Sequence, residues 1–241
     1  MKQFFRRIFY KLGYKDSFLQ KLYISLMSSK AEAQKEEAAK KVNTIGDDIL
    51  NIVVSVSKEQ SVLIWPEFGT LLGAYRDKSF ISFDTDIDLG ILTTDFSDEV
   101  MNAFIDRGCK KVRQLHLASV QSEEKKLLET TLEYNGLNFD LFLSDRIGDK
   151  QRKVYISYQK LDEIKSTYKC KYYTVDFAPN DACEVFINDI RLLYPANPEI
   201  YLKAIYGETF MVPIKGWIPP KVNPILTYMD SKKYFVQETK Y

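Results

Sequence analysis

Acidic and apolar residues alternate along residues 84–92, and this pattern constrains the fold more than any other feature of the chain. The segment reads DTDIDLGIL. On a β-strand, successive side chains point to opposite faces, so Asp84, Asp86 and Asp88 share one face and the apolar residues share the other. We therefore expect a half-buried strand with hydrophobic core on one side and a cluster of negative charge on the other.

A second segment, residues 137–143, places a single acid in an apolar strand pattern. It reads LNFDLFL, with Asp140 on the face opposite to the alternating apolar residues. Asn-Gly at positions 135–136 is a strong signal for a short hairpin, and it joins this segment to an expected strand over residues 126–133. If the two acidic strands are neighbours in one sheet, Asp140 lies beside Asp86 and Asp88.

Three carboxylates gathered in this way repel one another unless a cation lies among them. Their oxygen atoms are the ligands that Mg²⁺ and Mn²⁺ prefer in proteins. The sequence therefore predicts a catalytic site for Mg²⁺ (or Mn²⁺) with Asp86, Asp88 and Asp140 as metal ligands. The role of Asp84, at the start of the first strand, is left open.

Two other interpretations of the acidic run are weaker. A helix-loop-helix calcium site requires glycine at its sixth position and glutamate at its twelfth, whereas this chain has Leu89 and Asp95 there. A solvated acidic loop does not need an apolar residue at every second position. The strand interpretation accounts for both the acids and the apolar residues.

A glycine-containing turn precedes the acidic strand by about a dozen residues. Residues 65–76 read WPEFGTLLGAYR. Gly69 and Thr70 are placed to open a helix whose free N–H groups bind phosphate, and Arg76 near its end is able to grip a phosphate or carboxylate. A Gly-Thr pair alone is equally typical of a helix cap. With the acidic strand behind it, the turn predicts substrate binding by Gly69, Thr70 and Arg76.

The order of these motifs is typical of the nucleotidyltransferase superfamily. More narrowly, residues 69–92, GTLLGAYRDKSFISFDTDIDLGIL, resemble the LicD and fukutin family, and the resemblance returns at FDLF (139–142) and YLKAIYG (201–207). It implies an α+β, nucleotidyltransferase-like fold: a mixed sheet with flanking helices, here with an N-terminal helical extension. It also implies that Gly69 and Thr70 form the phosphate turn, that Asp86 and Asp88 bind metal, and that Asp140 is the third carboxylate.

The same resemblance implies a transferase of polysaccharide or cell-surface glycan biosynthesis. Its members move a phosphorylated small group, such as an alditol phosphate or phosphocholine, from a CDP-linked donor to a glycan or glycolipid acceptor. Two alternatives remain open: a nucleotidyltransferase that acts on a protein or small molecule with the same acids, and a non-catalytic cation- or glycan-binding protein.

Helical periodicity over residues 29–57 predicts a long helix whose second half is buried. We therefore expect an N-terminal helical extension over residues 1–57 and a catalytic domain over residues 58–241. Further helices are expected over 98–107 and 199–206, and strands over 171–177 and 183–193.

Charge and cysteine content restrict the partners and the compartment. The 34 basic and 33 acidic residues nearly cancel, so we expect no nucleic-acid partner. The three cysteines, Cys109, Cys170 and Cys183, are widely spaced, which favours a reducing compartment and a cytoplasmic location. Residues 1–13 have the pattern of a basic amphipathic helix, expected either to contact a membrane surface peripherally or to pack on protein.

Overall fold

The computed structural model describes residues 18–119, 121, 124–147, 150–160, 167–177, 182–195, 197–213, 226–228 and 234–241. The helix predicted within residues 1–13 lies outside this part of the chain. Four helices are described: α2 (Phe18–Gln60), α3 (Phe68–Arg76), α4 (Asp98–Ile105) and α5 (Pro198–Tyr206).

Nine of the described strands form one mixed sheet, and β8 and β9 form a separate hairpin. The strands are β1 (Ile64–Pro66), β2 (Ile87–Leu92), β3 (Lys110–Ser119), β4 (Lys125–Tyr134), β5 (Leu137–Ile147), β6 (Lys150–Lys160), β7 (Thr167–Phe177), β8 (Cys183–Ile187), β9 (Ile190–Tyr194), β10 (Leu226–Tyr228) and β11 (Tyr234–Lys240). The order β1-β2-β5-β4-β3-β11-β7-β10 is completed by β6, which pairs with β5 and β7. Pairing of β2 with β5 is parallel, and the other described pairings are antiparallel. The α+β class with a mixed sheet and flanking helices is thus confirmed.

Strand β5 is the branch point of this sheet. Its first half pairs with β2 on one side and β4 on the other, and its last residues pair with β6. Through β6, β7, β11 and β3 the pairings return to β4, so the hydrogen bonding closes into a circuit. Asp140 lies in the first half of β5 and is therefore held by backbone pairing on both sides.

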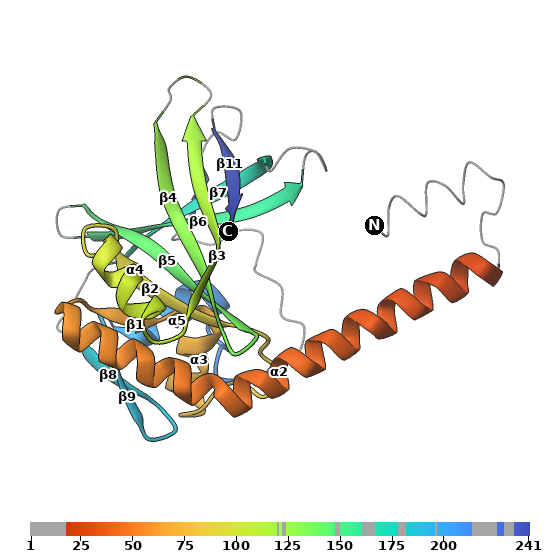
Figure 1. Ribbon diagram of the computed structural model, residues 1–241, viewed down its shortest axis with the longest axis horizontal. Coiled ribbons are helices and arrows are strands. Elements are labelled where there is room, and N and C mark those ends of the chain that lie inside the picture. The colour runs from red at the N-terminus through yellow and green to blue at the C-terminus, as the bar shows by residue number, and fades with distance from the viewer. Residues whose placement is uncertain are drawn as a thin grey trace.

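The helices cover the sheet near β1, β2 and β5. Figure 1 shows the C-terminal part of α2 against the body of the molecule, whereas its N-terminal part extends away. Helix α4 packs against α2, and α3 packs against β2, β8 and α5. The helix predicted over residues 29–57 is present and longer at both ends. No helix within the described ranges combines the length and hydrophobicity of a membrane-spanning segment.

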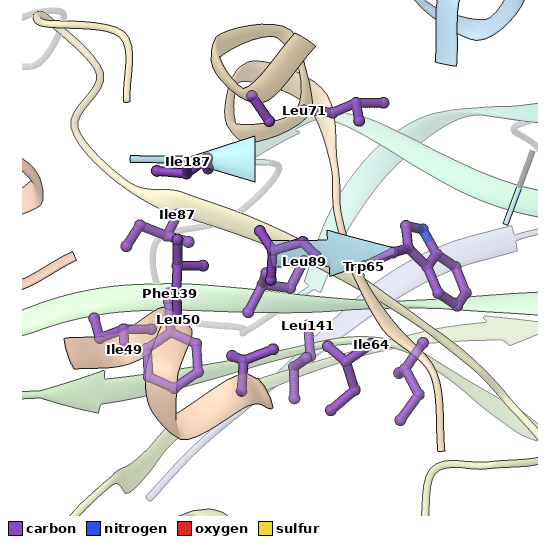
Figure 2. Close-up of a cluster of buried hydrophobic side chains, with 14 of the residues drawn as sticks. Ile49, Leu50, Ile64, Trp65, Leu71, Ile87, Leu89, Phe139, Leu141 and Ile187 are labelled. Atoms are coloured by element: carbon purple, nitrogen blue, oxygen red, sulfur yellow. The ribbon is translucent and has the colours of Figure 1, made fainter. Parts of the chain in front are cut away.

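The hydrophobic core lies on one face of β2 and β5. Paired positions on these strands contribute fully or almost fully buried side chains: Ile87, Leu89, Ile91, Phe139, Leu141 and Leu143. Figure 2 shows Ile49 and Leu50 of α2 beside Phe139 in this cluster. Burying each such side chain contributes about 1.5–3 kcal/mol. A shift of one residue in β2 would expose this apolar set, so the core also fixes which face the aspartates occupy.

Two hairpins test the sequence predictions of strands. Asn135 and Gly136 both have positive φ angles, 49° and 77°, and connect β4 to β5 as predicted from the Asn-Gly pair. The prediction of a single strand over residues 183–193 was wrong. Asn188, with a φ of 52°, and Asp189 form a turn that divides this segment into β8 and β9.

Candidate metal centre

Asp86, Asp88 and Asp140 converge on the face of the sheet opposite to the core. Asp88 and Asp140 are direct partners in the parallel pairing of β2 with β5, and Asp86 immediately precedes β2. One carboxylate oxygen from each aspartate lies within 4.8 Å of the others. The expected meeting of the two acidic segments is therefore present, and the three oxygens could hold a divalent cation.

Crowding and desolvation make this cluster unfavourable without a cation. Burial, followed by repulsion from Asp140, raises the pKa of Asp86, although its carboxylate retains access to solvent. Burial also raises the pKa of Asp140, while the hydrogen bond from Thr131 and the charge of Arg113 partly offset it. A bound cation would favour the charged form of both groups.

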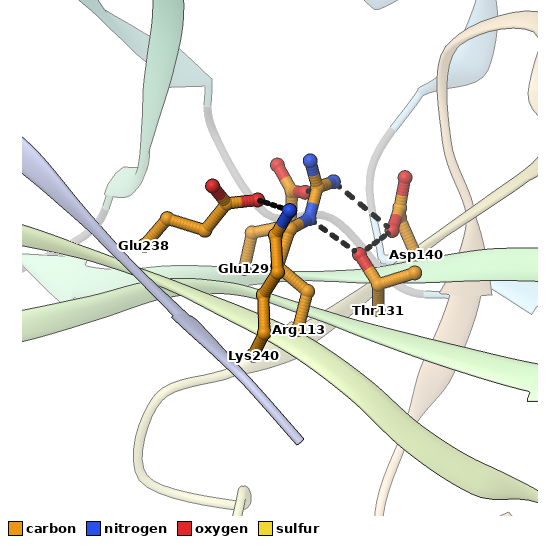
Figure 3. Close-up of polar contacts among 6 residues, drawn as sticks. All are labelled: Arg113, Glu129, Thr131, Asp140, Glu238 and Lys240. Atoms are coloured by element: carbon orange, nitrogen blue, oxygen red, sulfur yellow. Dashed lines mark hydrogen bonds and ion pairs between the residues drawn. The ribbon is translucent and has the colours of Figure 1, made fainter. Parts of the chain in front are cut away.

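Three residues from β3 and β4 surround Asp140, as Figure 3 shows. The Thr131 hydroxyl donates to Asp140 Oδ1 at 2.5 Å. Arg113 Nε donates to Thr131 Oγ1 at 3.1 Å, and Arg113 Nη2 lies 2.5 Å from Glu129 Oε1 and 3.8 Å from Asp140 Oδ1. The third carboxylate is thus part of a network that spans three strands.

Sequence reasoning missed this network, although part of it had a signal. The Asn-Gly hairpin sets the register of β4 against β5, and that register places Thr131 directly opposite Asp140. Arg113 gave no such signal, because its position depends on how β3 pairs with β4.

An open cleft of about 440 Å³ adjoins the acidic cluster. Asp86, Asp140 and Thr131 line it together with Arg113 and Lys240. Lys240 is the register partner of Arg113 on β11, and both cations line the cleft together with Glu238, which lies 3.9 Å from Lys240 Nζ. A ligand with anionic groups could therefore contact a metal ion and protein cations together.

Thr70 couples the first turn of α3 to the acidic strand. Its side chain is buried, and its hydroxyl accepts a hydrogen bond from the backbone N–H of Asp88 at 2.9 Å. Phe68, two residues before Thr70, has a φ of 44°, a strained conformation for a bulky residue, and its ring packs edge-on against Phe142 at a centroid distance of 5.1 Å. In this structure the Thr70 hydroxyl therefore positions the strand, and its predicted contact with substrate stays a prediction.

Gly69 allows Asp84 to approach the same turn. A Cβ atom at position 69 would lie 2.4 Å from Asp84 Oδ2, so any other residue would displace the carboxylate. Burial, followed by repulsion from Asp86, raises the pKa of Asp84 to about 7. Asp84 thus adds an acid next to the cluster, on the side of α3.

Arg76 lies in a second pocket, of about 240 Å³, which Gly69, Asp84 and Tyr206 also line. Its guanidinium is largely buried and donates two hydrogen bonds to Asp77, at 2.9 and 2.7 Å. Two of the three predicted substrate-binding residues, Gly69 and Arg76, therefore share a pocket. This pocket and the cleft beside the metal centre adjoin consecutive residues, Asp84 on one side and Thr85 on the other.

Glu67 connects the turn at the start of α3 to the YLKAIYG segment (201–207). This fully buried carboxylate accepts hydrogen bonds from Trp65 Nε1 at 2.6 Å and from the Tyr201 hydroxyl at 2.8 Å. A Cβ atom on Gly90 would lie 2.2 Å from Trp65 Nε1, so glycine is required for this packing. The YLKAIYG segment on α5 is thereby held against the turn that opens α3.

The model of the LicD/FKTN/FKRP nucleotidyltransferase domain matches residues 61–182, which is about half of the chain. This chain belongs to that family. The matched LicD-family region contains Gly69, Thr70, Arg76 and all three clustered aspartates.

Curated relatives of this LicD-family chain include three mammalian proteins named ribitol-5-phosphate transferase FKTN. The Mus musculus protein is 27% identical over 188 residues, which cover 73% of this chain and 36% of that protein. The Homo sapiens protein gives the same values, and the Macaca fascicularis protein is 26% identical over 188 residues. The chain thus spans about a third of the length of the relatives it matches.

Proposed function

We propose that this chain is a metal-dependent transferase that moves an alditol phosphate or phosphocholine from a CDP-linked donor to a glycan or glycolipid acceptor. Family membership and the ribitol-5-phosphate transferase activity named for its relatives support the reaction class. The observation that carries the proposal is the convergence of Asp86, Asp88 and Asp140 beside an open cleft.

The ligand set fits Mg²⁺ or Mn²⁺. All three side chains offer carboxylate oxygens, and their mutual approach within 4.8 Å is suited to binding one small divalent ion. Arg113 offsets only part of the negative charge, because it is also paired with Glu129. When bound, the metal would supply the positive charge that stabilises the departing nucleotide.

The proposed transfer breaks one bond of the donor diphosphate. The acceptor hydroxyl oxygen bonds to the phosphorus that carries the alditol or choline, and the bond from this phosphorus to the bridging oxygen breaks. CMP leaves with that oxygen, and the hydroxyl proton passes to solvent or to a basic group. Asp86, Asp88 and Asp140 would hold the metal, while Arg113 and Lys240 would contact anionic parts of the substrates from the wall of the cleft.

Gly69 and Arg76 line the second pocket and are proposed to contact the substrate there. Thr70, also proposed as a substrate-binding residue, does not line this pocket, and its hydroxyl accepts from the Asp88 N–H. The N-cap residue of α3, Glu67, makes no side-chain capping bond, and its carboxylate accepts from Trp65 and Tyr201 instead. The positive end of the helix dipole at this turn favours a phosphate group.

The division of the chain is also a proposal. Residues 58–241 would form the catalytic domain and residues 1–57 a helical extension, with residues 1–13 as a peripheral contact to the cytoplasmic face of a membrane. This arrangement would bring the cleft to acceptors that are built on lipids.

The test is a screen of CDP-linked alditols and CDP-choline with and without Mg²⁺, with CMP release and acceptor mass as readouts. We expect metal-dependent CMP release and an acceptor that gains the mass of an alditol phosphate or phosphocholine unit. A gain of the nucleotide mass would establish a nucleotidyltransferase instead. Metal binding without cleavage of any donor would favour a non-catalytic protein.

A further inference from the structure

We infer that Arg113 and Thr131 are positioning residues. Their contacts occupy one carboxylate oxygen of Asp140 and orient the other oxygen toward the metal. Arg113, Thr131 and Asp140 together are called the Asp140 relay below. The inference rests on the metal centre of the proposed function and adds residues that do not themselves bind the metal.

The direction of the hydrogen bonds in the relay is fixed by chemistry. A guanidinium group has no acceptor, so Arg113 Nε must donate to Thr131 Oγ1. The single proton of the Thr131 hydroxyl is then available for Asp140 Oδ1. Both the Thr131 hydrogen bond and the closest approach of Arg113 involve Oδ1, which leaves Oδ2 as the oxygen these contacts do not use.

A local irregularity in β3 places Arg113 in the relay. The pairing of β3 with β4 shifts by one residue between Lys111 and Arg113, and it shifts back between Leu115 and His116. Without the first shift, Val112 would lie opposite Thr131 and Arg113 would point to the other face of the sheet. The shifted register covers only residues 113–115, the stretch of β3 nearest to Asp140.

Glu129 restrains the guanidinium of Arg113. Its nearly buried carboxylate lies 2.5 Å from Arg113 Nη2, whereas Asp140 Oδ1 lies 3.8 Å from the same atom. Arg113 is therefore held within reach of Thr131 but beyond hydrogen-bonding distance of Asp140. This geometry suits a residue that acts through Thr131 and leaves room for a metal ion.

Two effects oppose each other if Arg113 loses its charge. The hydrogen bond from Arg113 to Thr131 would be lost, which weakens metal binding, but the net charge around the site would become more negative, which favours a cation. Variants that conserve charge avoid this conflict. Thr131→Val removes only the hydroxyl at nearly constant shape, and Arg113→Lys keeps the charge but replaces the fork that reaches both Thr131 and Glu129 with a single ammonium.

The experiment measures the Kd for Mn²⁺ of the full chain without donor, by electron paramagnetic resonance of free Mn²⁺. Loss of such a supporting hydrogen bond typically weakens metal binding 10–100-fold, so we expect about a 10-fold increase in Kd for Thr131→Val. Arg113→Lys should shift Kd in the same direction. Thr131→Ser, which keeps the hydroxyl, should bind like the wild type.

The matched control is Thr130→Val, on the opposite face of β4. Thr130 is fully buried and its hydroxyl accepts from Gln114, so the substitution removes a hydrogen bond of the same kind away from Asp140. It should leave the Kd for Mn²⁺ unchanged. If Thr131→Val does not fold, Arg113→Lys carries the test by itself.

Unchanged Mn²⁺ affinity in both Thr131→Val and Arg113→Lys would overturn the relay while leaving the proposed function intact. An equal loss of affinity in Thr130→Val would also overturn it, because the effect would then be one of general strand stability. Failure of the wild type to bind Mn²⁺ would instead contradict the metal centre and the proposed function together.

Discussion

At the residue scale, Asp86 and Asp88 are each placed to offer one oxygen to a metal ion, and each also brings negative charge toward Asp140. In the proposed function the same two carboxylates therefore support the reaction and lower the stability of the metal-free protein. We expect Asp86→Asn and Asp88→Asn to reduce turnover by more than the roughly 10–100-fold that changes outside the ligand shell cost. The free energy of unfolding of the metal-free protein should stay the same or rise, because like-charge repulsion is relieved.

Turnover assays and urea denaturation in chelator measure these two quantities. Asp48→Asn, at an exposed position on α2, is the control for the substitution itself. Near-normal turnover in either variant, or a loss of several kcal/mol in stability, would show that the aspartates have a structural role.

Two acids near the site predict how the stability of the metal-free protein depends on pH. Burial and the charge of Asp86 raise the pKa of Asp84 from 3.8 to about 7, and burial and the charge of Asp140 raise that of Glu129 from 4.5 to about 8 despite its pairing with Arg113. For each acid, between its ordinary pKa and its raised pKa, the folded chain binds more protons than the unfolded chain. Its stability should therefore fall as pH rises from about 4 to about 8.

Denaturation midpoints in chelator at several pH values across this range check the prediction, with Glu129→Gln expected to flatten the dependence. Saturating Mg²⁺ should also flatten it, since the cation stabilises the charged acids. Stability that increases steadily toward pH 8 in chelator would contradict the assignment of these two groups.

Between elements, one hydrogen bond links α3 to β2. The Thr70 hydroxyl accepts from the Asp88 N–H, and Thr70→Val would leave that donor without its partner. We expect a loss of about 1–3 kcal/mol in the free energy of unfolding, with weaker metal binding because the backbone of Asp88 is less restrained. Thr44→Val, at an exposed position on α2, is the comparison in the same denaturation experiment. Equal stability of both variants would show that α3 does not support the acidic strand in this way.

The strands that build the metal centre were predictable because their signals are local. Alternation of apolar residues gave β2 and β5, and the Asn-Gly pair gave the turn between β4 and β5. The meeting of Asp88 and Asp140 required one further assumption, that the two strands are neighbours, and the core formed by their apolar faces explains why they are.

Other features depend on pairings that the sequence does not display. The buried side chains change from odd positions in β8, Val185 and Ile187, to even positions in β9, Leu192 and Tyr194, and the prediction of one strand overlooks this change. The face on which Arg113 lies follows from a register shift against β4. Arg76 lines a pocket, in agreement with a substrate-binding role. Its two hydrogen bonds to the neighbouring Asp77 depend on side-chain conformations that the sequence pattern does not indicate.

For the molecule as a whole, deletion of residues 2–13 tests whether this segment binds the protein to a membrane surface. If they tether the protein to a membrane, their deletion should leave turnover on a soluble acceptor unchanged and abolish salt-sensitive binding to anionic vesicles. Each basic residue contributes about 1 kcal/mol near such a surface. Vesicle sedimentation and thermal denaturation of the two proteins measure this. A lower melting temperature or altered oligomeric state on deletion, with an intact protein that ignores vesicles, would show that the segment packs on protein.

In the proposed function, three aspartates hold the metal ion of a transferase. The most direct measurement is the anomalous scattering of Mn²⁺ in crystals of the wild-type chain grown with Mn²⁺ and CDP. We expect a peak about 2.1 Å from carboxylate oxygens of Asp86, Asp88 and Asp140, with CDP in the adjoining cleft. Ordered CDP together with Mn²⁺ bound elsewhere, or with no anomalous peak at these aspartates, would contradict the claim.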